Sequence, residues 1–485
     1  MRVAVQANIE QHRGQCEATG PLRVLPENPR YFTDGHGKAI YLTGSHTWSN
    51  LVDLGQTDPP PVFNFEGYLD FIKRHNHNLI RLWRWELTKC QYQKGDALRY
   101  AEPFPWLRTG PGTALDGKPK FDLSKFDELY FDRLRSRVIA AKEKGIYVLI
   151  MLFEGYGMQA FPAPWCWDGH PFNINNNVNG VNGDVDGDGK GLETHTLRVP
   201  EITALQKAYV KKAVDVVNDM DNVLYEIANE SHSGSDAWQN HMIDYIHSYE
   251  ANKPKQHPVL YSSALGNGYP PLWASRAEAV SPGWPSTDAG SIPYRDDAPA
   301  NDGRKVVVSD TDHLWGMGGN YGWVWKSFLR GLNPIFMDPY ETEAYQNHPT
   351  KSECGLIRKN MGYTLNYSRK IDLVGMVPRG DLCSTNYCLA NPGKEYLIYV
   401  SSRHQRRFRW YCRLRLDRWL RWMAGLIGLH ETVRVEMLTP SQMYRTEWFN
   451  PGTGEAIDGR IPSGGSTRFF TSPFAGDAVL YVYCP

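Results

Sequence analysis

The sequence predicts an α/β fold: a (β/α)8 TIM barrel followed by a small antiparallel β-sandwich. Two observations predict the barrel. Eight short apolar runs end in polar or aromatic residues, and helical patterns lie between several of them. Strands that are apolar throughout favour a parallel sheet covered on both faces. Eight such strands spread over about 300 residues favour a closed barrel.

The predicted strands are AIYLTGSHTW from Ala39, NLIRLWRWE from Asn78, IYVLIMLFEG from Ile146, NVLYEIANES from Asn222, PVLYSS from Pro258, AVSPGW from Ala279, KVVVSDTDH from Lys305 and NPIFMDPYE from Asn333. Helical patterns cover 65–75, 123–144, 202–220 and 237–251. The connections between the fifth and seventh strands are rich in Pro and Gly and show little helix. An open doubly wound sheet is the structural rival. It carries a Gly-rich phosphate loop after its first strand, and this chain has no such loop there.

Three regions are expected: an N-terminal extension over 1–27, the barrel over 28–385, and the β-sandwich over 390–485. The last region changes to short strands and turns, such as EYLIYVSS and AVLYVYC. It either binds polymer or caps the barrel, and we expect capping. Its segment 403–430 is rich in Arg and Trp and is readable as an interfacial helix or a nucleic-acid patch. We favour a third interpretation, a local reading-frame error, because the segment departs abruptly from the strand pattern around it.

Composition excludes several classes of function. Lysine plus arginine and aspartate plus glutamate each number 53, so no net field attracts nucleic acid or an anionic membrane. The chain has no apolar run of bilayer length, and its first residues lack the apolar core of a signal peptide. We expect a soluble monomer without nucleic-acid or membrane partners, and the compartment stays open. The eight cysteines show no zinc spacing, and Cys383 and Cys388 either close a small loop or remain thiols.

Carboxylates close several of the predicted strands. Glu230 ends the fourth, and Asp310 and Asp312 end the seventh, where period-two alternation puts both on one face. Glycosidic cleavage needs one carboxyl to protonate the leaving oxygen and a second to attack the sugar or activate water. Barrel chemistry sits at the carboxyl ends of the strands, so these three residues are the candidate catalytic groups. Glu226 lies deeper in the fourth strand and is expected to pair with an arginine.

These motifs resemble those of clan A glycoside hydrolases. YEIANE is similar to the fourth-strand signature of the clan, which implies Glu230 as acid/base and Asn229 as the group that binds the sugar 2-hydroxyl. NLIRLWRWE is similar to the second strand, which implies that Arg81 hydrogen-bonds the nucleophile. The clan has a glutamate nucleophile after the seventh strand, whereas this chain offers Asp310 or Asp312. We favour Asp310, which directly follows the apolar run. The shorter side chain requires a closer approach to the anomeric carbon or a shift towards inversion.

RYFTDGHGKAIYLTGSHTWSN and VSDTDHLWG further resemble a group of cellulase-like and apiosidase-like barrels, whose members carry a C-terminal domain described as collagen-binding. EWFNPGTGEAIDG and FFTSPFAGDAVLYVY are similar to that domain. The resemblance implies an enzyme, a retaining glycoside hydrolase acting on a plant-type poly- or oligosaccharide. Such a substrate favours a secreted or periplasmic protein. The alternative is a non-catalytic carbohydrate-binding protein on a barrel scaffold. A metalloprotease is disfavoured because the chain has no HExxH motif.

The predicted rim gathers residues that suit a sugar ring. Tryptophan faces match the apolar face of a pyranose, although each ring has ordinary packing as its alternative role. The expected substrate-binding residues are Asn229, Arg81, His46, Trp48, Glu154, His313, Trp315, Trp284 and Tyr340.

The loop NGDVDGDGKGLE matches the spacing of a calcium loop. Asn182, Asp184, Asp186, Asp188 and Glu193 supply the oxygen side chains, and Gly187 suits the sharp turn. No amphipathic helix precedes the loop, so we expect a structural calcium ion rather than a regulatory one. The alternative is a flexible loop that holds no ion. We expect no cofactor for catalysis.

Overall fold

The structure, a computed structural model, describes residues 18–91, 97–159, 164–283, 292–340, 351–402, 430–462 and 465–485. The chain forms two compact units. The first comprises Met1–Arg23, His46–Leu265 and Ser275–Ala277, and the second comprises Val24–Ser45, Gly266–Ala274 and Glu278–Pro485. The Arg/Trp-rich segment 403–430 lies almost wholly outside the described residues, so its interpretation stays open. The predicted domain boundaries stay predictions.

Eight strands form one nearly closed parallel sheet, as the sequence predicts. Its strand order is β3-β15-β14-β13-β12-β11-β10-β5, which is chain order around a barrel once the last strand returns beside the first. Each strand lies within one of the eight apolar runs. Their bounds are β3 (Gly44–His46), β5 (Leu79–Leu82), β10 (Tyr147–Glu154), β11 (Val223–Asn229), β12 (Val259–Ser262), β13 (Ala279–Ser281), β14 (Val306–Asp310) and β15 (Asn333–Met337).

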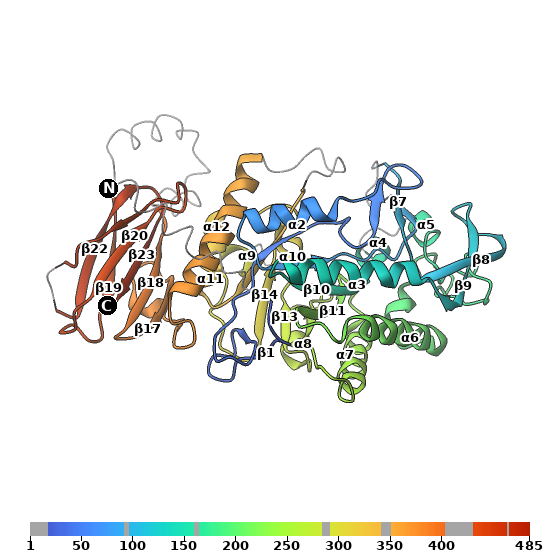
Figure 1. The fold of residues 1–485 in the computed structure, drawn as a ribbon, viewed down its shortest axis with the longest axis horizontal. Coiled ribbons are helices and arrows are strands. Elements are labelled where there is room, and N and C mark those ends of the chain that lie inside the picture. Colours follow the sequence, from blue (N-terminus) through green and yellow to red (C-terminus); the bar gives the residue numbers. More distant parts are fainter. Residues whose placement is uncertain are drawn as a thin grey trace. The chain divides into compact units, whose positions relative to one another are not determined.

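In the first unit, four long helices follow the predicted patterns (Figure 1). They are α2 (Phe65–Arg74), α3 (Glu128–Glu143), α6 (Pro200–Val217) and α7 (Asp236–Glu250). The prediction started α3 at residue 123, which is wrong. The chain up to Phe126 belongs to the hairpin β8 (Trp106–Thr113) and β9 (Pro119–Phe126). The helix begins after Asp127, whose carboxylate caps it by accepting from the Leu129 N–H.

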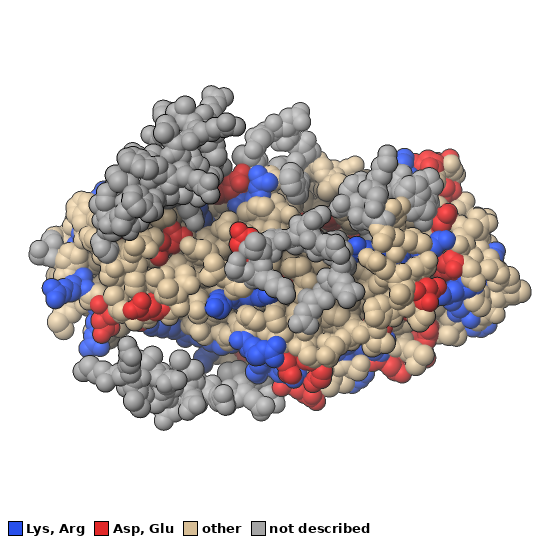
Figure 2. Space-filling model, turned by 90° about the horizontal axis from the view of Figure 1, so that it is seen from above, with Lys and Arg blue, Asp and Glu red and all other residues tan. Residues whose placement is uncertain are grey.

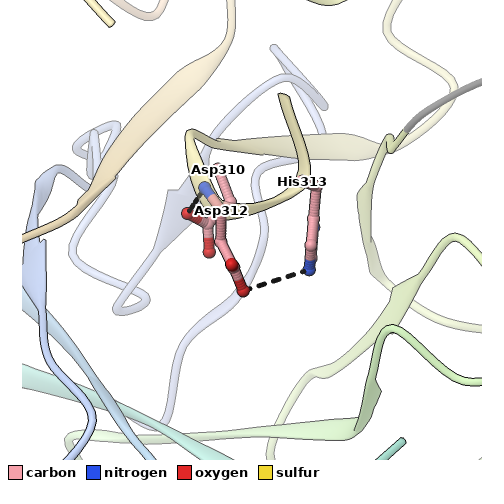
Figure 3. A group of neighbouring side chains, drawn as sticks. All are labelled: Asp310, Asp312 and His313. Atoms are coloured by element: carbon pink, nitrogen blue, oxygen red, sulfur yellow. Dashed lines mark hydrogen bonds and ion pairs between the residues drawn. The ribbon is translucent and has the colours of Figure 1, made fainter. Parts of the chain in front are cut away.

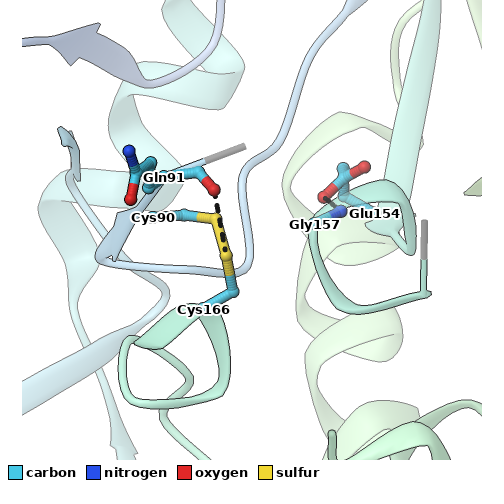
Figure 4. The surroundings of a disulfide bond; sticks show 5 residues. All are labelled: Cys90, Gln91, Glu154, Gly157 and Cys166. Atoms are coloured by element: carbon cyan, nitrogen blue, oxygen red, sulfur yellow. Dashed lines mark hydrogen bonds between the residues drawn. A yellow bond between two sulfur atoms is a disulfide. The ribbon is translucent and has the colours of Figure 1, made fainter. Parts of the chain in front are cut away.

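Shorter elements complete this unit: β4 (Asp53–Gly55), β6 (Lys89–Cys90), β7 (Arg99–Glu102), α4 (Tyr156–Gln159), α5 (Pro164–Trp167) and the 3-10 helix η1 (Leu192–His195). A disulfide joins Cys90 at the end of β6 to Cys166 in α5 (Figure 4). The sequence did not predict it. Cys383 and Cys388 lie in the other unit and are free thiols, one of the two predicted alternatives.

The second unit holds barrel strands β13 to β15 and the C-terminal strands. Its helices are α8 (Pro270–Ala274), α9 (Pro293–Asp296), α10 (Asp312–Trp315), α11 (Tyr321–Leu329), α12 (Lys351–Lys370) and the 3-10 helix η2 (Gly380–Leu382). Its other strands are β1 (Arg23–Val24), β2 (Phe32–Thr33), β16 (Val377–Pro378), β17 (Cys388–Asn391), β18 (Glu395–Val400), β19 (His430–Glu436), β20 (Arg445–Phe449), β21 (Ala456–Asp458), β22 (Thr467–Ala475) and β23 (Ala478–Tyr483).

The C-terminal strands form the predicted antiparallel sandwich. A six-stranded sheet, β16-β17-β18-β23-β20-β21, packs through one face on the pair β19-β22. Its other face packs on α11 and α12 of the same unit, where Leu397, Tyr399 and Tyr481 meet Trp325 and Tyr367. Both faces of β18 and β23 are therefore buried, which explains why β23 and the part of β18 after Glu395 consist of aliphatic and tyrosine residues.

Lysine and arginine side chains are interspersed with aspartate and glutamate on the face shown in Figure 2. None of the helices that the structure describes combines the length and hydropathy needed to cross a bilayer.

Candidate functional site at the strand ends

A buried arginine organises the ends of β5 and β11. The Arg81 guanidinium donates to both carboxylate oxygens of Glu226, with Nε 2.6 Å from Oε2 and Nη2 2.6 Å from Oε1. Ser262 on β12 donates a third hydrogen bond to Glu226, at 2.5 Å. Both charged side chains are only 1% exposed, and a buried carboxylate needs this degree of compensation. Glu226 thus pairs with an arginine, as the sequence predicts.

The same guanidinium orients Asn229. Arg81 Nη2 donates to Asn229 Oδ1 at 2.8 Å, so the amide oxygen faces the arginine and the Nδ2 group points away from it. Asn229 also hydrogen-bonds Glu154, which lies beside it in the register of β10 and β11. Since the amide oxygen already accepts from Arg81, Nδ2 is the donor to Glu154. Three residues of the predicted set are therefore in contact here: Arg81, Asn229 and Glu154.

Glu154 is a fully buried carboxyl at the end of β10. Its oxygens accept from the backbone N–H of Tyr156 at 2.7 Å. They also accept from the backbone N–H of Gly157 at 3.4 Å (Figure 4). The pKa of Glu154 is raised to about 8, chiefly by burial; the negative charge of Glu86 adds to the rise, and these hydrogen bonds oppose it. The side chain is therefore mostly protonated at neutral pH.

Glu230, the candidate acid/base, directly follows β11 and is partly exposed. Its φ is 39°, in the left-handed region that residues with a side chain rarely adopt. Backbone strain of this kind persists only where surrounding contacts impose it, and it is frequent at active sites. Gly155 imposes one such contact, because its N–H donates to the Asn229 carbonyl at 2.8 Å.

In the second unit, Asp310, Asp312 and His313 come together at the end of β14 (Figure 3). Asp310 is buried, and its Oδ1 accepts from the Asp312 backbone N–H at 2.9 Å. Asp312 is partly exposed, and its Oδ2 lies 3.9 Å from His313 Nε2. His313 Nδ1 is held by the Ser281 hydroxyl at 2.9 Å. One ligand atom from each of the three lies within 4.8 Å of the others, so the group is also able to hold a divalent cation.

The other expected sugar-binding residues differ in exposure. His46 and Trp48 are buried; His46 stacks on Trp83 at 5.7 Å, and the Trp48 carbonyl accepts from the Trp85 indole. In the second unit, Trp315 is partly exposed and meets Trp323 edge-on at 5.3 Å. Tyr340 is partly exposed too. Trp284 lies outside the described residues.

The predicted calcium loop forms a compact turn. One ligand atom from each of Asp184, Asp186 and Asp188 lies within 4.8 Å of the others. Asp184 Oδ1 is buried without a hydrogen-bond donor, whereas Asp188 pairs with Lys190 at 2.6 Å. Glu193 is buried at the end of the loop and accepts from the Asp186 N–H at 3.1 Å. Asn182 Oδ1 accepts from the Asp184 N–H at 3.1 Å.

Sequence reasoning missed a polar network behind Glu154. At its centre is Glu86, the last residue of the second predicted strand. In the structure it is buried between two imidazoles, with His170 Nε2 3.2 Å from one oxygen and His195 Nε2 3.2 Å from the other. His170 follows α5 and His195 ends η1, and no spacing pattern in the sequence connects them to Glu86.

Comparison with known proteins places the fold. Residues 89–265 match the model of a domain of unknown function, DUF6298. A solved glycoside hydrolase superposes with a TM-score of 0.57 at 14% identity, over 96% of this chain and 97% of that one. The chain shares the fold of glycoside hydrolase barrels. A family 5 glycoside hydrolase from Bacteroides vulgatus superposes with a TM-score of 0.54 at 12% identity, over 96% and 93%. No curated protein sequence matches the chain.

Proposed function

We propose that the chain is a retaining glycoside hydrolase that cleaves O-glycosidic bonds of a plant-type poly- or oligosaccharide. The observation that carries the proposal is the constraint on the end of β11. Asn229 is oriented by Arg81 and Glu154, and Glu230 follows it in a strained conformation. Backbone strain and tightly fixed side chains at one strand end are typical of a catalytic group. The shared barrel fold supports the proposal, as does the disulfide, which is typical of proteins in oxidising compartments.

The proposed reaction has two steps. Glu230 donates its proton to the glycosidic oxygen while an aspartate carboxylate attacks the anomeric carbon, so the leaving sugar departs as an alcohol and a glycosyl ester forms. Glu230, now a carboxylate, takes a proton from water, which attacks the same carbon and frees the aspartate. Asn229 Nδ2, fixed by its oxygen's bond to Arg81, offers its second hydrogen to the sugar 2-hydroxyl.

Asp310 is the proposed nucleophile, with Asp312 as the alternative. The Asp312 backbone N–H donates to Oδ1 of Asp310 and so orients its carboxylate at the end of β14. Asp312 is more exposed and faces His313 instead, which suits a group that contacts the substrate.

A panel of plant polysaccharides and aryl glycosides tests the function. We expect release of reducing sugar by the wild type. Glu230→Ala and Asp310→Ala should each lower turnover by about 10²-fold or more, and azide should restore turnover of Asp310→Ala as a glycosyl azide of inverted configuration. If azide restored turnover of Asp312→Ala but not of Asp310→Ala, Asp312 would be the nucleophile. Sugar binding without turnover would favour the alternative, a carbohydrate-binding protein.

We also propose that Asn182, Asp184, Asp186, Asp188 and Glu193 hold a structural Ca2+. The specific support is the buried oxygen Asp184 Oδ1, which lacks a donor beside two further carboxylates. Gly187, at the turn position of the motif, has a φ of 74°, as the calcium-loop pattern requires.

A further inference from the structure

We propose that Ser231, His195 and Glu86 form a buried relay of hydrogen bonds that positions the acid/base Glu230. This inference rests on the proposed function. Ser231 follows Glu230 in the chain, and its hydroxyl lies 3.3 Å from His195 Nδ1. His195 Nε2 lies 3.2 Å from Glu86 Oε1.

The partners of Glu86 fix the direction of every hydrogen bond. The Phe172 N–H donates to His170 Nδ1 at 2.9 Å, so the proton of that imidazole is on Nε2, which faces Glu86. Burial opposes ionisation of Glu86, but Arg84 and the two histidines outweigh it and hold the pKa of Glu86 well below its ordinary value. Glu86 is thus an acceptor at both oxygens. A neutral His195 imidazole therefore donates from Nε2 to Glu86, and its Nδ1 accepts the Ser231 proton.

Ring stacking fixes both histidines that contact Glu86. His195 stacks on Trp238 of α7 at 4.5 Å with an interplanar angle of 12°. His170 stacks on Trp167 at 5.0 Å, and Trp167 follows the disulfide-bonded Cys166. An imidazole held against an indole and a carboxylate has little freedom to turn, so it offers the Ser231 hydroxyl a fixed point.

Glu86 also supports the turn that carries Glu230 through the end of β10. Its Oε1 accepts from the Glu154 N–H at 2.7 Å, which fixes the end of β10. The next residue, Gly155, donates to the Asn229 carbonyl, and the Ser231 carbonyl accepts from Leu265 at 2.8 Å. The residues on both sides of Glu230 are therefore held, and the strained φ of Glu230 is imposed from outside its own side chain.

The order serine, histidine, carboxylate also occurs in serine hydrolases, but a nucleophilic role does not fit here. Ser231 is only 1% exposed and points into the protein at His195, so no acyl substrate can reach it. Ser231, His195 and Glu86 are positioning residues, and their effect on the reaction passes through Glu230.

The test compares phenyl and 2,4-dinitrophenyl glycosides of a sugar that the wild type hydrolyses. A phenyl group needs protonation to leave, whereas dinitrophenolate leaves without it. Ser231→Ala and His195→Gln should lower kcat/KM for the phenyl glycoside by on the order of 10²-fold, the usual cost of misplacing a catalytic group. For the dinitrophenyl glycoside, kcat/KM should stay within about twofold of the wild type, because general acid help is not needed. His195→Gln retains an amide donor towards Glu86 and loses the acceptor for Ser231, so it should behave as Ser231→Ala does.

Ser235→Ala is the matched control. It removes another buried serine hydroxyl of the same turn, one that bonds Gln239 in α7 rather than His195. It should keep the wild-type ratio of the two kcat/KM values. Equal losses on both substrates, or none, in folded Ser231→Ala and His195→Gln would overturn the relay and leave the proposed function intact. No turnover of any glycoside by the wild type would overturn both.

Discussion

Gly155 lies so close to the backbone of Ser231 that a Cβ atom at position 155 would stand 2.7 Å from the Ser231 Cα and 3.0 Å from the Glu230 carbonyl oxygen. Both neighbours are backbone atoms, which cannot rotate away as a flexible side chain does. The bare glycine at the end of β10 therefore allows the turn that carries Glu230 to pack against the neighbouring strand end.

Gly155→Ala should displace the Glu230 turn. We expect a loss of unfolding free energy of about 1–3 kcal/mol, as for other overpacked sites, and a fall in kcat of on the order of 10²-fold from misplacement of the acid/base. Thermal unfolding and steady-state kinetics measure the two effects. Gly117→Ala is a control for stability, since nothing lies within 4 Å of its added Cβ, although its φ of 86° strains the alanine. An active Gly155→Ala with wild-type kcat would contradict the prediction.

Glu154 should make the protein less stable as pH rises. Its pKa is raised from an ordinary value of 4.5 to about 8 in the folded state, chiefly by burial. The unfolded chain therefore loses this proton first. The group's contribution to stability is complete below about pH 4.5 and is lost by about pH 8, at a cost of up to a few kcal/mol.

Glu154→Gln isolates this contribution, because the amide resembles the protonated carboxyl but does not titrate. Melting temperatures of both proteins between pH 4.5 and 8 measure the effect, and the difference between them should grow with pH in favour of the variant. Parallel curves over this window would show that Glu154 is ionised in the folded protein.

The barrel was predictable because its strands are buried on both faces. A run such as YVLIMLF in β10 has no polar residue to compete with the parallel-sheet interpretation. The position of Glu230 directly after a barrel strand was predictable for the same reason, since the apolar run ends there. The start of α3 was not, since the hairpin residues 123–126 continue its helical pattern, and only the Asp127 cap distinguishes them.

The polar contacts behind the site could not be predicted from the sequence. Glu86, His170 and His195 are far apart in the chain and meet only through tertiary packing, and lone histidines carry no spacing signal. The same holds for Cys90 and Cys166, which are 76 residues apart. Strand periodicity predicts which face a residue occupies, but it does not predict which distant loop returns to meet it.

Loss of the Cys90–Cys166 disulfide should lower stability. The bond ties β6 to α5, and Trp167 beside it supports His170. We expect Cys90→Ala/Cys166→Ala to lose about 2–4 kcal/mol of unfolding free energy. Thermal melts with and without reductant measure this. Reductant should destabilise the wild type and have no further effect on the double variant; a variant as stable as the oxidised wild type would contradict the prediction.

Calcium should stabilise the loop 182–193 and, through it, the first unit. The loop packs on Trp167, since a Cβ at Gly191 would lie 2.3 Å from that ring. At free Ca2+ about 100-fold above Kd, binding should add about 2.7 kcal/mol to the unfolding free energy. Calorimetric titration of chelator-treated protein and its melting temperature check this. Asp184→Asn should abolish the stabilisation by calcium, because it removes the negative charge of the carboxylate whose Oδ1 accepts no hydrogen bond. Asp302→Asn, in a turn of the other unit where the aspartate pairs with Arg304, should retain it. Equal melting temperatures of the wild type with calcium and with chelator would mean that Lys190, Arg198 and backbone N–H groups satisfy the carboxylates without an ion.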